Sequence, residues 1–199
     1  MKVIALANQK GGVAKTTSTY NLAAAKALAS KRNRVLMIDL DPQSSLTISC
    51  GMEPGVGAIE DYNICRLFET DKRKQADPTE CCFTVDATGL QNLYILPSNL
   101  ELAVKERNLT STRNSDVKLY NSLKALEPYF DWCFIDCPPQ LGTLLSNALT
   151  AANEVIVPSK TDYLSYRGLQ DLMDTIEGIK SGDGDRSLNP DLFLRGVIA

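Results

Sequence analysis

The chain has 199 residues, with 21 basic and 24 acidic side chains and no histidine. The missing histidine excludes Ser-His-Asp and Cys-His catalysis, a histidine general base and histidine-ligated zinc. The net charge of −3 argues against attraction of nucleic acid to the whole surface, although not against a local basic patch. No secretory signal precedes the six cysteines, which are therefore expected to be reduced, as in a cytoplasmic protein.

Short apolar runs alternate with helical patterns along the chain. Several runs are continuously apolar, as over 35–38, which is typical of strands covered on both faces of a parallel sheet. The alternation predicts an α/β fold, a doubly wound and mostly parallel sheet flanked by helices. Strands are expected at 2–7, 34–40, 92–96, 132–136, 153–157 and 192–199, with a short edge strand near 82–86. Helices are expected at 15–30, 58–69, 99–109, 115–127, 142–151 and 165–181.

A glycine-rich segment over residues 8–17 joins the first expected strand to the first expected helix. Glycines expose backbone N–H donors and a helix N-terminus points at an anion, so this context predicts polyphosphate binding. Lys15 would supply the cation for the β- and γ-phosphates, and Thr16 the hydroxyl for Mg²⁺. The ordinary pattern G-x-x-x-x-G-K-[ST] is not met, because Gln9 and Ala14 occupy its glycine positions. The segment matches the deviant form K-G-G-x-x-K-[ST]; the alternative is a glycine turn with two solvated lysines.

Two of the apolar runs end in aspartate. Asp39 and Asp41 follow the run over 35–38, and side chains at i and i+2 share a face. Both are therefore expected to emerge together at the carboxyl edge of the sheet, where α/β proteins bind ligands. Asp136 ends the run over 132–135, as expected for a Walker B acid that binds Mg²⁺ through water. Each pattern alone could be a solvated strand end, but beside a phosphate loop they predict a nucleotide and metal site.

These three segments, in this order, resemble the motifs of the ParA/MinD group of deviant Walker A ATPases, a class of P-loop NTPases. The stretch over 39–43 is similar to switch I of its ParA/Soj branch. The resemblance implies a slow, Mg²⁺-dependent ATP hydrolase with ATP and Mg²⁺ as cofactors. Such chemistry needs lysines, a metal and an oriented water, so the missing histidine is no obstacle.

The resemblance also implies roles for individual residues. Catalytic roles fall to Lys15, to Lys10, which would reach across a nucleotide-sandwich homodimer, and to Asp41, which would position the attacking water. The implied Mg²⁺ ligands, direct or through water, are Thr16, Asp39 and Asp136. The implied phosphate-binding residues are Lys10, Gly11, Gly12, Val13, Ala14, Lys15, Thr16 and Thr17.

The resemblance covers residues 2–199 and implies an ATPase that segregates plasmid or chromosomal DNA. It would switch between an ATP dimer and ADP or nucleotide-free states, and a ParB-type centromere-binding partner would stimulate hydrolysis. The ATP state would bind DNA non-specifically, which implies a cytoplasmic protein that associates with the nucleoid. No stable membrane anchor is visible in the sequence. The last residues read as a buried strand, so we expect a single P-loop ATPase domain over 1–199 that lacks its C-terminal elements.

Other interpretations stay open. One is a MinD-like or other positioning ATPase acting on a membrane or a surface machine. Another is a weakly hydrolysing nucleotide-binding scaffold, since a methyl group at Ala14 opposes a positive φ. The stretch over 159–162 is similar to the guanine-reading motif of GTPases, although Pro139 fills the position where a GTPase has glycine. Cys133 and Cys137 could contribute to an iron–sulfur cluster across a dimer, but without any C-x-x-C we favour packing of the thiols.

Overall fold

The computed structural model describes residues 1–110, 112, 114–182 and 187–199. Its strands are β1 (Lys2–Leu6), β2 (Val35–Asp39), β3 (Phe83–Thr84), β4 (Leu93–Leu96), β5 (Trp132–Asp136), β6 (Glu154–Pro158) and β7 (Phe193–Ile198). They form one sheet in the order β3-β4-β2-β5-β1-β6-β7, in which β3 pairs antiparallel with β4 and the other neighbours run parallel. The predicted doubly wound, mostly parallel sheet is therefore confirmed, including the short edge strand.

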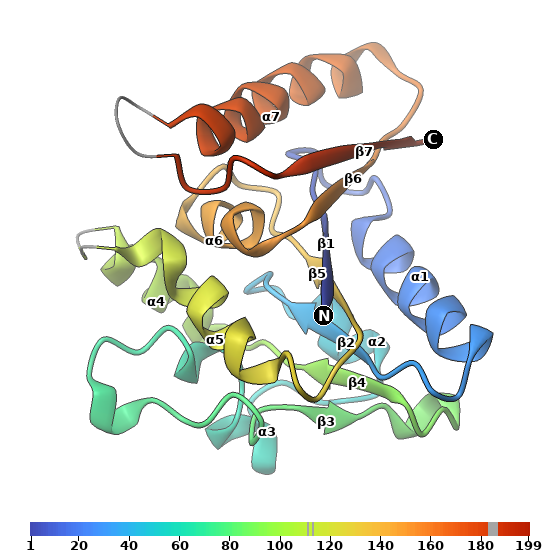
Figure 1. Cartoon of the computed structure of the whole chain (residues 1–199), viewed down its shortest axis with the longest axis vertical. Helices are drawn as coiled ribbons and strands as arrows, with labels where there is room; N and C mark the ends of the chain where they lie inside the picture. Colours follow the sequence, from blue (N-terminus) through green and yellow to red (C-terminus); the bar gives the residue numbers. More distant parts are fainter. Residues whose placement is uncertain (111, 113, 183–186) are drawn as a thin grey trace.

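Helices cover both faces of this sheet (Figure 1). They are α1 (Lys15–Ala29), α2 (Ser45–Ser49), α3 (Ala58–Asp61), α4 (Glu101–Leu109), α5 (Lys118–Leu126), α6 (Thr143–Ala151) and α7 (Tyr163–Ser181). Side chains alternate across each strand, so β1 sends Ile4 and Leu6 into an apolar cluster with α1 and α2. Val3 and Ala5 of the same strand enter a second cluster with α4, α5, α6 and α7. No helix in the described ranges is long and apolar enough to cross a bilayer.

The helix expected over 58–69 is wrong. α3 ends at Asp61, and a 3₁₀ turn covers Ile64–Arg66. Between them Asn63 has an extended backbone, with φ −155°, and its side-chain oxygen accepts from the Cys65 N–H at 2.9 Å. Its amide also donates to the Ile59 carbonyl at 2.7 Å. An asparagine that bonds to nearby backbone in this way competes with a continuous helix, which the apolar spacing alone could not reveal.

The order of the strands creates a common edge for several loops. β1 lies between β5 and β6, while β2 lies on the far side of β5. The connection from β1 runs to β2 on one side, and the connection from the neighbouring β5 runs to β6 on the other side. Such a switch point is where open α/β sheets bind ligands. The loops after β1, β2, β5 and β6 all leave the carboxyl edge at this point.

Candidate functional site

The loop after β1 has an unusual backbone conformation. Gly12 and Ala14 both lie in the left-handed region, with φ 69° and 63°. Ala14 therefore adopts the positive φ that its methyl group disfavours, at a cost of about 1 kcal/mol. Asn8, for which the sequence predicted no role, fixes the start of the loop: its amide donates to the Pro158 carbonyl, and its oxygen accepts from the Lys10 N–H.

The two lysines of the loop have different surroundings. Lys15 begins α1 and is buried, with its Nζ 3.2 Å from the Lys10 carbonyl oxygen. Burial lowers the pKa of the Lys15 amine, and the negative charge of Asp136 opposes that shift. The Lys10 amine instead binds both carboxylate oxygens of Asp162, at 2.9 and 2.8 Å. Lys15 is thus placed beside the strand-end acids, whereas Lys10 is held by the loop after β6.

Asp136 at the end of β5 faces the start of α1. The Thr16 hydroxyl donates to Asp136 Oδ2 at 2.6 Å. Within the described residues, the buried Oδ1 has no hydrogen-bond partner. Burial raises the pKa of Asp136 to about 7, helped by the nearby Asp39 charge and opposed by Thr16 and Lys15.

This pair of oxygens fits a magnesium ion. A hydroxyl and a carboxylate are hard oxygen ligands, and the orphaned Asp136 Oδ1 is an acceptor that a cation or its water would satisfy. In the described part of the chain, three or more acidic, cysteine or histidine side chains do not gather into a metal site. Mg²⁺ does not need such a cage, because it is commonly held by one or two carboxylates together with substrate phosphates.

Asp39 lies next to Asp136, since the two residues are register partners on β2 and β5. Its Oδ2 accepts from the Thr47 N–H at 2.8 Å and from the Thr47 hydroxyl at 2.7 Å, while Oδ1 accepts from the Asp41 N–H at 3.2 Å. Burial raises the pKa of Asp39 to about 6, opposed by the bonds from Thr47. The predicted shared emergence of Asp39 and Asp41 is therefore only half right: Asp39 is fully buried, and Asp41 is partly exposed.

Sequence reasoning missed Thr47 because it missed α2. This helix has only five residues and carries serine and threonine, which have low helix propensity. The available signal was a buried aspartate at a strand end followed closely by a hydroxyl residue in an apolar run. Such an acid needs a nearby donor, and Thr47 supplies two.

A cavity of about 620 Å³ lies beside the loop. The loop after β6 forms one wall, and its Lys160 Nζ would lie 3.9 Å from a Cβ on Gly12. Asp162 of the guanine-like motif also lines the cavity, but Lys10 binds both of its carboxylate oxygens. The remaining lining residues are Val13, Ala14, Ser18, Pro158, Ser159, Thr161, Ile198 and Ala199.

The cysteines considered as cluster ligands lie inside the protein. Cys133 and Cys137 are fully buried in the apolar cluster that contains α4 to α7. Burial raises the pKa of both thiols, which disfavours the thiolate that ligation requires. The structure thus gives both thiols a packing role.

Comparisons with known proteins agree with this geometry. A family model described as an AAA domain matches residues 1–192. The sporulation initiation inhibitor protein Soj of Bacillus subtilis is 36% identical over 99% of this chain and 71% of the relative. The chromosome partitioning protein ParA of Myxococcus xanthus is 35% identical over 99% of this chain and 64% of the relative.

A solved structure is similar as well. Cobyrinic acid a,c-diamide synthase from Mycobacterium smegmatis, with bound ATP analogue and magnesium, has a TM-score of 0.84 and 36% identity. The match covers 100% of this chain and 74% of that one.

The doubly wound sheet and the lysine-bearing glycine loop at its switch point define a P-loop nucleoside triphosphatase with a deviant Walker A motif. Within that class, the chain belongs to the ParA/Soj family of the ParA/MinD superfamily, a family of partition ATPases.

Proposed function

We propose that this protein binds ATP with Mg²⁺ at the carboxyl edge of its sheet and hydrolyses the ATP slowly. The observation that carries this proposal is the Thr16–Asp136 hydrogen bond beside the glycine loop, with an orphaned carboxylate oxygen on the same aspartate. The magnesium and ATP analogue in the M. smegmatis structure support it. The single sheet with helices on both faces supports one ATPase domain over 1–199.

Each group in the site has a distinct task in this proposal. The loop N–H groups from Lys10 to Thr17 and the Lys15 amine hold the phosphates. Thr16 and Asp136 hold Mg²⁺, and Asp39 supports its water shell from the neighbouring strand. When bound, Mg²⁺ supplies positive charge that offsets the charge developing on the transferred phosphoryl group. Asp41, which is partly exposed, orients the attacking water.

The relatives described above support a biological role in DNA partitioning. We propose that the ATP-bound chain forms a homodimer, binds DNA non-specifically in the cytoplasm at the nucleoid, and segregates plasmid or chromosomal DNA. A ParB-type partner would stimulate hydrolysis and return the protein to its ADP or nucleotide-free state. The M. xanthus relative is a chromosome partitioning protein, which supports this role.

The Lys10–Asp162 ion pair makes this proposal testable. A role for Lys10 at the partner's phosphates requires this pair to open, and an exposed pair costs only about 0–1 kcal/mol to break. Light scattering should detect an ATP-dependent dimer for the wild type and for Lys31→Ala, an exposed lysine in the turn after α1. Lys10→Ala should stay monomeric in ATP. An unchanged Lys10→Ala dimer contradicts the trans role.

A gel shift in ATP and in ADP tests the DNA-binding step. A DNA shift that occurs in ATP but not in ADP supports the partition role. Binding to anionic vesicles in place of DNA would point instead to a MinD-like positioning ATPase.

One observation favours a second candidate, a scaffold that binds nucleotide but scarcely hydrolyses it. Ala14 carries left-handed strain inside the phosphate loop. Steady-state turnover with and without DNA separates the candidates. Asp41→Ala should retain the ATP dimer and slow phosphate release; release at the wild-type rate contradicts the water-positioning role.

A further inference from the structure

Glu106 of α4 contacts the start of α6. Its Oε1 accepts the N–H of Leu144 at 3.3 Å, and Leu144 lies in the first turn of α6. Gly142 precedes that turn and has no side chain to cap it, and the sequence of the turn contains no acidic residue. The Glu106 carboxylate therefore supplies, from another helix, both the acceptor and the negative charge that a helix N-terminus favours.

Gly142 leaves room for this carboxylate. A Cβ at position 142 would lie 2.3 Å from Glu106 Oε1 and 3.4 Å from its Cδ. The φ of Gly142 is −136°, which any residue can adopt. The glycine thus provides space for Glu106 rather than a special backbone conformation, and the two residues fit together as a pair.

The contact lies at the end of a short loop that begins at the proposed magnesium ligand. Only residues 137–141 separate Asp136 from Gly142. The Cys137 N–H donates to the Leu6 carbonyl of β1 at 3.2 Å, so β1 holds the start of the loop. Two consecutive prolines, at 138 and 139, restrict φ within it. The loop over 137–141 therefore has few free dihedral angles. A displacement of Gly142 is expected to move Asp136 as well, because little of it can be absorbed in between.

The helix that carries Glu106 is also tied to the other aspartate. The Ser98 N–H, just before α4, donates to the Thr47 hydroxyl at 2.9 Å, and the same hydroxyl donates to Asp39. Asn99 Oδ1 accepts from the Glu101 N–H at 3.0 Å. The start of α4 is thus linked to the end of β2 through the hydroxyl of Thr47 in α2.

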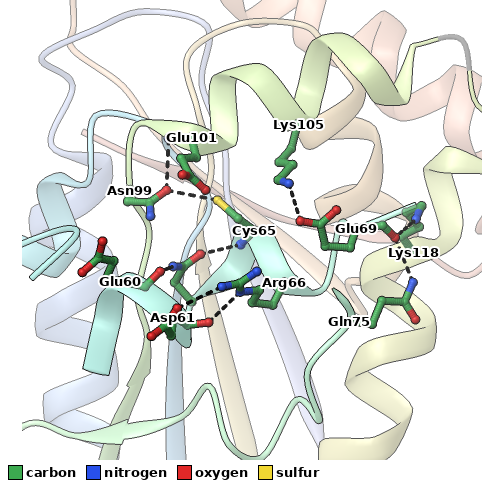
Figure 2. Close-up of polar contacts among 11 residues, drawn as sticks. Glu60, Asp61, Cys65, Arg66, Glu69, Gln75, Asn99, Glu101, Lys105 and Lys118 are labelled. Carbon is green, nitrogen blue, oxygen red and sulfur yellow. Dashed lines mark hydrogen bonds and ion pairs between the residues drawn. The ribbon is translucent and has the colours of Figure 1, made fainter. Parts of the chain in front are cut away.

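The middle of α4 is fixed by a buried carboxylate (Figure 2). The Lys105 amine pairs with the Glu69 side chain, which is only slightly exposed. Lys118 of α5 donates to the Glu69 backbone carbonyl at 2.7 Å, and Gln75 donates to the same oxygen at 2.8 Å. These contacts hold α4 in place. Glu106 can therefore fix the position of the start of α6, instead of moving with it.

We propose that Glu106 is a positioning residue of the nucleotide site. Its carboxylate fixes the loop over 137–141 behind Asp136, and α4 connects that loop to the Asp39 side of the site. This inference rests on the proposed ATPase function. The proposed phosphate-holding groups lie in the loop after β1 and at the start of α1, so the loss of Glu106 should lower turnover much more than nucleotide affinity.

Hydrogen exchange on the nucleotide-free protein tests the contact without any reference to catalysis. In Glu106→Ala, amides within 140–146 should exchange about fivefold faster, the effect expected for loss of a helix cap. Glu106→Gln keeps an acceptor oxygen and should restore most of the protection. The matched control is Glu101→Ala, an exposed glutamate at the other end of α4, which should exchange as the wild type does. Unchanged exchange in Glu106→Ala overturns the proposal.

Turnover at saturating Mg²⁺ and ATP tests the positioning role. Glu106→Ala should lower kcat about five- to tenfold and leave nucleotide Kd within about twofold, and Glu106→Gln should recover most of the rate. Gly142→Ala should behave like Glu106→Ala, because the added methyl group displaces the carboxylate. An equal loss in Glu101→Ala, or a loss of affinity matching that of kcat, overturns the proposal. If the wild type neither binds nor hydrolyses ATP, the proposed function fails, while the exchange result still decides whether Glu106 holds the loop.

Discussion

The ends of β2 and β5 look alike in the sequence and differ in the structure. Asp39 and Asp136 are register partners, both almost fully buried, and burial raises the pKa of each. One carboxylate oxygen of Asp39 accepts two hydrogen bonds from Thr47, and the other accepts one from the Asp41 N–H. Asp136 binds Thr16 with one oxygen, and the other has no partner within the described residues.

The difference separates two uses of a buried acid. A buried carboxylate is costly unless hydrogen bonds or an opposite charge compensate for its lost hydration. For Asp39 the protein supplies that compensation itself, so this acid organises the loop after β2. For Asp136 the compensation is incomplete, and a bound cation would complete it. An apolar strand ending in aspartate therefore predicts where an acid lies but not which of the two roles it has.

The largest effect on nucleotide binding is expected at Lys15. The charge of Asp136 acts on its amine, whereas Asp39 is bound by Thr47 instead. Lys15→Ala should weaken ATP binding roughly 100-fold or more, because the buried positive charge that binds the phosphates is lost. Calorimetry in Mg²⁺ measures the affinity, and Lys31→Ala serves as the control. If Lys15→Ala binds ATP as tightly as the wild type does, the loop does not bind the phosphates. The cation-binding role of Asp136 then loses its support as well.

The next effect separates the two aspartates through their threonines. Thr47→Val removes a donor to Asp39 and the acceptor of the Ser98 N–H, and should cost about 2–3 kcal/mol of unfolding free energy. The matched change Thr16→Val removes one hydrogen bond rather than two and should cost less, about 1 kcal/mol, but should weaken Mg²⁺-dependent nucleotide binding about 10- to 100-fold. Urea unfolding and calorimetry on both variants provide the measurements. Equal stability losses would erase the distinction.

A third effect depends on pH. The pKa of Asp136, about 7, lies above that of a free carboxyl group, so the folded protein binds this proton more tightly than the unfolded chain does. Its stabilising contribution is full at low pH and is lost as pH rises through 7. Asp136→Asn lacks this loss, and should gain on the order of 2 kcal/mol relative to the wild type between pH 5 and pH 8.5. Urea unfolding measures the two stabilities. If the midpoints of the wild type and of Asp136→Asn change equally with pH, the burial of Asp136 is already fully compensated.

The smallest effect is expected outside both strand ends. Ala14→Gly removes the cost of a methyl group at φ 63° and should stabilise the protein by roughly 1 kcal/mol or less, since glycine also gains entropy in the unfolded chain. Thermal unfolding measures this change. A destabilised variant would show that the Ala14 methyl group makes contacts that outweigh the backbone strain.

The sequence predicted the sheet well because its strands are short apolar runs buried on both faces, which leave a clear signal. It also placed a glycine-rich loop between the first strand and the first helix, because the residue types of that motif are consecutive. It could not predict contacts between distant segments, such as Lys10 with Asp162 or Glu106 with Leu144. It failed over 58–69 because one asparagine cap outweighed a helical pattern.

The central position of β1 has a consequence for folding. This strand pairs with β5 and β6, whose residues begin at 132 and 154, and not with β2. The two partners of β1 therefore lie more than a hundred residues further along the chain, and such non-local pairing slows folding. The glycine loop gains its Asn8 bond to Pro158 only then. A nascent chain would thus bind nucleotide only after residues as far as Pro158 have been added, so ligand would stabilise folding intermediates that contain β6 but not earlier ones.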